Sequence, residues 1–252
     1  MKLTFLSSVL LALTTCSCTN SSLNFTSKKT IDSSIESPII TRTINVKDVS
    51  EIECSRAVTV LYEQGPSTSV TLSAPSDIAD LVIVESKGAT LHCTVDQEYH
   101  IKNGMDRVVV TVVSPSVTSF EATTAGTIKA QNYINLDKDE IDIETTTAAT
   151  VIINKINCKA LDCNSSTAGT ITVTDITCHD MVKANASTGS SINLSGNATT
   201  IDFDASTGAN INASKLSANE GQAKSSTGSD IDCNVKVLDK SATTGGDVSN
   251  KR

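Results

Sequence analysis

The sequence contains no tryptophan and few aromatic residues of any kind. Four phenylalanines and three tyrosines occur in 252 residues, so a core built from large rings is excluded. The 38% of apolar residues is nevertheless enough for a folded core, and Ile, Val, Leu, Ala and Thr must fill it. Small and β-branched residues of this kind favour thin layers of β-structure.

Positive charge is also scarce. The 20 Lys and Arg residues against 28 Asp and Glu residues give a net charge of −8, and this predicts no binding of nucleic acid. Between Ser119 and Lys251 there is no arginine, and His179 is the only histidine there. This half of the chain therefore lacks the residue that most naturally holds an acidic sugar.

No apolar run reaches the length of a membrane-spanning helix. The run from Leu3 to Leu13 is short and ends in small residues before a cysteine, as is typical of an export signal. The end of this segment resembles the lipobox of bacterial lipoproteins, whose first mature residue is an acylated cysteine. We expect lipidation at Cys18, with Cys16 as the alternative, and a signal peptide over residues 1–18 that leads to the bacterial outer membrane. The other interpretation is an ordinary cleaved signal with two incidental cysteines.

The next segment, residues 19–38, is polar and rich in Ser and Thr, which predicts a flexible tether. From Thr41 to Pro115 apolar and polar residues alternate, as in 58–62, 91–95 and 108–112. This alternation predicts β-strands. They either continue the repeat described next or form a separate cap on it, within one domain over residues 39–252.

From Ser119 onward the sequence repeats itself. Seven segments can be aligned on a central threonine, at positions 124, 147, 167, 188, 207, 227 and 244, so the spacing is 23, 20, 21, 19, 20 and 17 residues. Helical repeats are longer and need better helix formers, and the leucine-rich repeat pattern is absent. The fold class that remains is all-β: a parallel β-helix, or β-solenoid, of about 20 residues per coil over residues 119–250.

The residues of each repeat can be assigned to two faces. In the segment 182–194, even positions are small or apolar and odd positions are polar or Gly. We expect the even positions to face inward, and the Ile or Val four residues after each central threonine to form an inward ladder: Ile128, Val151, Ile171, Ile192, Ile211, Ile231 and Val248. The threonines would line a second inward stack or a corner. The Gly or Ala that follows each threonine suits a tight bend.

Taken together, these features resemble the head GIN domain of bacterial lipoproteins, an auto-transporter adhesin head domain. The matching features are the lipobox and tether, the strands at 42–46, 89–95 and 108–115, and the repeats of the form T-A/G-x-x-I. The resemblance extends over about residues 40–250. It implies a single-chain parallel β-helix with a role in adhesion, and its motifs carry no catalytic signature.

Six cysteines lie outside the signal segment: Cys54, Cys93, Cys158, Cys163, Cys178 and Cys233. Cys158 and Cys178 are one repeat apart, so they could form a disulfide in an oxidising compartment or pack as buried thiols. A zinc site from Cys158, Cys163, Cys178 and His179 matches no established ligand spacing. We expect no metal and no other cofactor.

A β-helix is also the scaffold of pectin-degrading enzymes, which need clustered carboxylates. The repeats offer Asp142, Asp162, Asp202, Asp204, Asp230 and Asp232, but the paired-Asp, Gly-His-Gly and Arg-x-Lys patterns of such enzymes are absent. We therefore expect these side chains to point outward into solvent and to catalyse nothing. Calcium-binding nonapeptide repeats are not matched either.

The function hypothesis that follows is a lipid-anchored cell-envelope protein that presents a rigid β-solenoid to a glycan or a protein. A polysaccharide-degrading enzyme and a periplasmic ligand-sensing component are the alternatives. Sugar-stacking aromatics are few, since Phe120, Tyr133 and Phe203 are the only ones in the repeats. Binding would therefore depend on outward rows of Asn, Thr and Asp.

Overall fold

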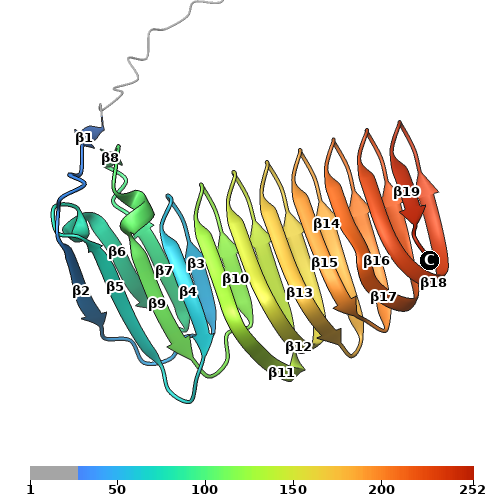
Figure 1. Cartoon of the computed structure of the whole chain (residues 1–252), viewed down its shortest axis with the longest axis horizontal. Helices are drawn as coiled ribbons and strands as arrows, with labels where there is room; N and C mark the ends of the chain where they lie inside the picture. The colour runs from blue at the N-terminus through green and yellow to red at the C-terminus, as the bar shows by residue number, and fades with distance from the viewer. Residues whose placement is uncertain (1–27) are drawn as a thin grey trace, which may run out of the picture.

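A computed structural model describes residues 28–252 as a β-solenoid with a small strand cap (Figure 1). The N-terminal strands are β1 (Lys29–Ile31), β2 (Ile39–Ile44), β3 (Glu51–Cys54), β4 (Thr59–Gln64), β5 (Ser69–Pro75), β6 (Val82–Lys87), β7 (Thr90–Val95), β8 (Tyr99–Ile101) and β9 (Val109–Ser114). Two short 3₁₀ helices, Ala79–Leu81 and Met105–Arg107, interrupt them. The repeats form β10 (Ser119–Ala122), β11 (Thr127–Thr145), β12 (Thr150–Ser165), β13 (Thr170–Cys178), β14 (Met181–Ala186), β15 (Ser191–Asn197), β16 (Thr200–Ala205), β17 (Asn210–Ser225), β18 (Asp230–Ala242) and β19 (Asp247–Asn250).

Each coil of the solenoid has three sides. A pre-turn side, such as β14, leads to a sharp turn, and a post-turn side, such as 191–194, leads away from it. A third side, such as 195–197, then returns the chain to the next coil, which begins at β16. Equivalent sides of successive coils pair in parallel register. The predicted solenoid with a period of about 20 residues is confirmed.

The interior contains the residues that the periodicity assigned to it. The seven-residue ladder of Ile and Val runs in register and is 0–5% exposed at every position from Ile128 to Val248. Even positions between 182 and 194 are buried with one exception, Thr188. Because the interior is apolar and the outward positions are polar, a one-residue slip would expose the ladder to water, so the register is strongly specified.

The sharp turn of each coil explains why Thr188 is exposed. In all seven repeats the central threonine has a positive φ, between 47° and 53°. The φ of the Ala or Gly after it is also positive, between 60° and 76°. Two consecutive positive φ values, with a hydrogen bond such as Ser190 N to Ser187 O at 3.2 Å, define a type I′ turn. The threonines therefore form an exposed corner and not an inward stack. The turns also stack on one another, since the Gly189 N–H donates to the Thr207 carbonyl at 3.0 Å.

Ala168 adopts this left-handed conformation with φ of 62°, which strains an L-residue with a Cβ. Ala168→Gly should therefore raise the free energy of unfolding by about 0.5–1 kcal/mol. Urea unfolding followed by circular dichroism measures this change. The control is Ala184→Gly, in the interior of β14, which should be destabilising because extended backbone gains nothing from glycine. A loss of stability in Ala168→Gly would show that the turn is not strained.

The N-terminal strands both continue the coil and cap it. Strands β3 and β4 form a coil whose turn is Arg56–Ala57, and they pair in parallel with β10 and β11. Strands β7 and β9 form one further coil on the other side of β3 and β4. Three antiparallel strands, β2, β5 and β6, then close this end. The solenoid therefore extends beyond the regular repeats at its N-terminal end.

The prediction of a flexible tether is wrong for residues 28–38. Strand β1 pairs in parallel with β8, and Ser33 is buried, its hydroxyl 3.0 Å from the Asp77 carboxylate. Arg107 donates to the carbonyls of Ser34 and Ser37 at 2.6 and 3.1 Å. Sequence periodicity does not reveal this segment, because partners some 40–70 residues away hold it in place. Residues 19–27 lie outside the described part of the chain.

The C-terminal coil ends in exposed polar side chains at positions that are buried and apolar in the coil before it. Lys240 lies in register with the buried Ala223, and its Nζ donates to the Val248 carbonyl at 3.2 Å. Asn250 lies in register with Cys233, and its amide exchanges two hydrogen bonds with the Val235 backbone, at 2.9 and 3.1 Å. A charge and an amide at the open edge disfavour pairing with another strand.

The six cysteines of the described chain are all buried free thiols. Cys158 and Cys178 are direct neighbours in register, as their spacing predicted, and the structure shows them as stacked thiols and not as a disulfide. Burial raises the pKa of the Cys54 thiol to about 12. Burial also raises the pKa of Cys93, Cys163 and Cys233, so these thiols stay protonated and act as small apolar residues of the core.

Candidate functional site

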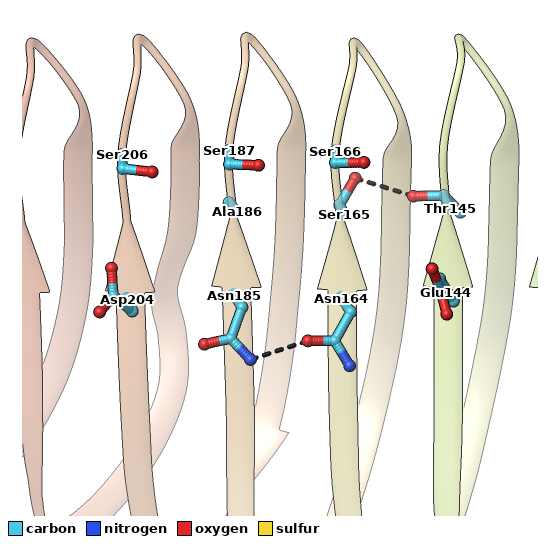
Figure 2. A pocket seen from close by; sticks show the side chains of 10 residues that line it. All are labelled: Glu144, Thr145, Asn164, Ser165, Ser166, Asn185, Ala186, Ser187, Asp204 and Ser206. Atoms are coloured by element: carbon cyan, nitrogen blue, oxygen red, sulfur yellow. Dashed lines mark hydrogen bonds between the residues drawn. The ribbon is translucent and has the colours of Figure 1, made fainter.

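A polar groove lies on the pre-turn side of four successive coils, just before the turns (Figure 2). One row of side chains, here called the amide–carboxylate row, consists of Glu144, Asn164, Asn185 and Asp204. A second, the hydroxyl row, consists of Ser166, Ser187 and Ser206. Both rows run across neighbouring strands because the coils are in register. The hollow between them has a volume of about 230 Å³.

Hydrogen bonds within the groove hold its amides in place. The Asn185 amide nitrogen donates to the Asn164 side-chain oxygen at 2.7 Å, and the Asn164 amide donates to Asp162 at 3.0 Å. Beneath them, the Thr145 and Ser165 hydroxyls lie 2.7 Å apart in the interior. The two carboxylates at the ends of the row, Glu144 and Asp204, are exposed and have no ion-pair partner among residues 28–252. The groove therefore presents preformed acceptors and donors to solvent.

A second outward row beside the groove is also largely acidic. It contains Asp142, Asp162, Lys183 and Asp202 in register. The Lys183 ammonium pairs with Asp162 at 3.1 Å. Burial, followed by the nearby charges of Asp162 and Glu140, raises the pKa of Asp142. Across these four coils the pre-turn side therefore carries more acidic than basic side chains, which repels anions and favours neutral or cationic partners.

In the two coils on the N-terminal side of the amide–carboxylate row, Glu121 and Glu53 occupy the equivalent positions, and Glu121 lies directly between Glu53 and Glu144. Partial burial, and then these two carboxylates, raises the pKa of Glu121. A raised pKa means that ionised Glu121 lowers stability, and that this cost disappears as the pH falls below the ordinary glutamate value of about 4.3. Glu121→Gln should therefore stabilise the protein at pH 7 by about 0.5 kcal/mol, since solvent screens the charges.

Thermal unfolding at pH 7 and pH 4 measures this difference. The matched control is Glu220→Gln, because Glu220 is exposed and lies in register between Thr200 and Val237, neither of which is charged. An equal gain for both variants, or a gain for Glu121→Gln that persists at pH 4, would contradict the proposed carboxylate repulsion.

The structure separates the aspartates that the sequence grouped together. All six point outward, as predicted. Asp142, Asp162, Asp202 and Asp204 lie on the pre-turn side, whereas Asp230 and Asp232 lie on the post-turn side. Sequence spacing could not distinguish the two groups before the turn position was known.

The remaining candidates from the sequence are a metal site, sugar-stacking aromatic residues and the lipidated cysteine. Within residues 28–252, no His, Cys, Asp or Glu residues are grouped in a way that could hold a metal ion. Phe120 and Phe203 are fully buried, so of the three aromatic residues in the repeats only Tyr133 is exposed, at 46%. The expected lipidation sites, Cys18 and Cys16, lie outside the described residues. The hydroxyl row was missed, although the Ser or Thr before each central threonine is visible in the aligned repeats.

The parallel coil and its outward polar rows define a β-solenoid. The chain belongs to the family described as "putative auto-transporter adhesin, head GIN domain", whose model matches residues 48–251. A comparison with curated proteins finds no match.

Solved structures of similar fold come from other bacterial proteins. One is titled a "putative lipid binding protein" from Parabacteroides distasonis, with a TM-score of 0.76 and 16% identity, covering 89% of this chain and 100% of that one. A "putative adhesin" from Parabacteroides merdae gives a TM-score of 0.74 and 15% identity over 89% and 100% of the two chains. Another from Bacteroides fragilis gives 0.63 and 21% over 87% and 99%. At these identities the likeness supports the fold alone.

Within residues 28–252, no helix has both the length and the apolar character needed to cross a bilayer.

Proposed function

We propose that this protein is a non-enzymatic binding module of the bacterial cell envelope, and that its polar groove binds neutral or amino-containing glycans. The observation that carries this proposal is the groove itself, in which amide, carboxylate and hydroxyl groups repeat across four coils. Sugars present hydroxyl groups along their length, and such groups pair well with rows of side-chain acceptors and donors. The family description as an adhesin agrees with this role.

The charge of the groove selects among glycans. Glu144 and Asp204 lack ion-pair partners in the described chain, and Asp142, Asp162 and Asp202 lie in the next row. Uronic and sialic acids would be repelled there, while neutral or amino sugars would not. Because the exposed aromatics needed for stacking are scarce, each contact would be weak. Repetition along the solenoid would supply avidity.

Glycan-array binding of the chain from Thr19, which contains every described strand, tests the proposal. The groove variant is Asn185→Ala with Asp204→Ala, and the matched control is Asn212→Ala with Asp230→Ala, the same residue types on the post-turn side. We expect binding of neutral or amino glycans that only the groove variant loses, by at least about tenfold. Mass spectrometry of the same wells should show intact glycans.

Three outcomes would overturn the proposal. Shortened glycans would establish an enzyme of the polysaccharide-degrading class. Equal loss in both double variants would place binding elsewhere. If no glycan on the array bound, the function would instead be binding of a protein partner or sensing of a ligand in the periplasm.

We further propose that Cys18, or alternatively Cys16, is acylated and anchors the module to the outer membrane. Two acyl signals suffice for stable attachment. Metabolic labelling with a fatty acid should mark the full chain, and one of the variants Cys18→Ser and Cys16→Ser should abolish labelling. Labelling that survives both single variants would contradict attachment at either site alone.

A further inference from the structure

A second hollow lies at the N-terminal end of the solenoid, where the coil departs from its regular pattern. Its volume is about 270 Å³, and its lining includes the apolar residues Val95, Ile101 and Met105 together with Tyr99. The remaining lining residues are Lys28, Arg56, Ala57, His100 and Thr124. None of these residues is acidic, which contrasts with the polar groove.

Arg56 occupies a corner that the regular repeats give to threonine. Arg56 and Ala57 both have positive φ, 56° and 62°, and the Ala57 N–H donates to the Thr124 carbonyl at 3.2 Å as the other corners do. In the adjoining coil of β7 and β9, the short turn is replaced by the segment 96–108, which contains β8. The hollow is formed between this longer segment and the Arg56 corner.

The hydrogen-bonding capacity of Arg56 is only partly used. Its Nη2 donates to the carbonyls of Tyr99 and Asp96, at 3.0 and 3.5 Å. Its Nε is buried and has no hydrogen-bond partner. No ion pair of residues 28–252 includes Arg56. Removing a guanidinium partly from water without a carboxylate partner costs free energy, unless an anion accepts its unused hydrogen bonds and balances its charge.

We infer that this hollow binds a small amphiphilic carboxylate, whose head group pairs with Arg56 and whose aliphatic part lies against Val95, Ile101 and Met105. A planar guanidinium matches a carboxylate in shape as well as in charge. At about 30 Å³ per small group, the hollow holds roughly ten heavy atoms, about the size of octanoate. This site is separate from the polar groove and does not depend on the glycan proposal.

Isothermal titration of the chain from Thr19 with sodium octanoate tests the inference. Octan-1-ol and octylammonium have the same chain with a neutral and a cationic head group. We expect octanoate to bind, octanol to bind more weakly and octylammonium not to bind. Arg56→Gln should weaken octanoate binding at least about tenfold, as expected for loss of a charged hydrogen bond, and should leave octanol binding unchanged.

Two further variants make the result specific. Arg56→Asn removes the charge and suits the left-handed backbone at this position, so a folding defect in Arg56→Gln would not obscure the outcome. Arg42→Gln removes an arginine that is already paired with Asp80, and it should leave octanoate binding unchanged. The inference is overturned if octanoate gives no heat up to about 10 mM, where even an inefficient ligand of this size binds. Equal octanoate affinity in wild type and Arg56→Asn, or equal affinity for octylammonium, would also overturn it.

Discussion

Replacing Gly196 by alanine is expected to destabilise the solenoid by about 3–5 kcal/mol or to prevent folding. Gly196 pairs in register with Ile176 of the preceding coil. A Cβ there would lie 2.2 Å from the Ile176 carbonyl oxygen and 2.4 Å from its nitrogen. The clash is with backbone that the sheet holds in place, and φ at Gly196 is 129°, a value that L-residues rarely adopt. Urea unfolding of the purified variant measures the loss.

Gly189→Ala is the matched control. Gly189 also has a positive φ, 69°, but no atom lies within 4 Å of its Cβ position. Only the left-handed backbone penalty applies there, about 1 kcal/mol. Equal losses for the two variants would show that the coils can separate locally at Gly196, and that the close contact between coils is not a requirement of the fold.

Removing the ring of Phe203 is the second change with a large expected effect. Phe203 is fully buried, and in register it lies between Ala184 and Ala223. The ring therefore fills space that two alanines leave open in the neighbouring coils. Phe203→Ala should cost about 3–5 kcal/mol, because it loses buried apolar surface and leaves a cavity.

The same column of residues provides a rescue experiment. Ala184→Leu adds volume in the adjoining coil, so the double variant Ala184→Leu with Phe203→Ala should recover part of the lost stability, measured again by urea unfolding. Tyr133→Ala, which truncates a ring that is 46% exposed, should change stability by less than about 0.5 kcal/mol. A small effect of Phe203→Ala, or the absence of any rescue, would show that the cavity collapses without cost.

These two positions matter to the proposed function because the groove depends on registration between coils. The amide–carboxylate row exists only while Glu144, Asn164, Asn185 and Asp204 remain in line across four coils. A Gly196 or Phe203 variant that folds with a local distortion should therefore bind glycans more weakly at the groove, although neither residue lines it. The solenoid serves the site by keeping the coils parallel.

Much of the fold could be predicted from the sequence. The spacing of the central threonines indicates the length of a coil, and the alternation in 182–194 indicates which side chains face inward. The inward ladder from Ile128 to Val248 follows directly from these two patterns and is confirmed. The location of the threonines was predicted less well, because the pattern alone does not tell an interior stack from an exposed type I′ corner.

The candidate sites were harder to predict. The outward Asn and Asp residues were visible, but their division between the pre-turn and post-turn sides depends on the turn geometry. The Arg56 corner was not predicted, because arginine stands there in place of the threonine on which the repeats were aligned, and its partners Asp96 and Tyr99 lie 40 and 43 residues further along the chain. Lipidation at Cys18 or Cys16 stays a prediction.

By itself, the sequence determined the all-β class, the coil of about 20 residues and the apolar interior, because these depend on local alternation and on a period that each repeat carries. Only the tertiary structure decided that β3 and β4 lie between the coil of β7 and β9 and the first regular repeat. It also decided that residues 28–38 are held against the cap and that the hollow beside Arg56 forms. These features depend on pairing between strands that are far apart in the chain, and no local pattern encodes which distant strand becomes the neighbour.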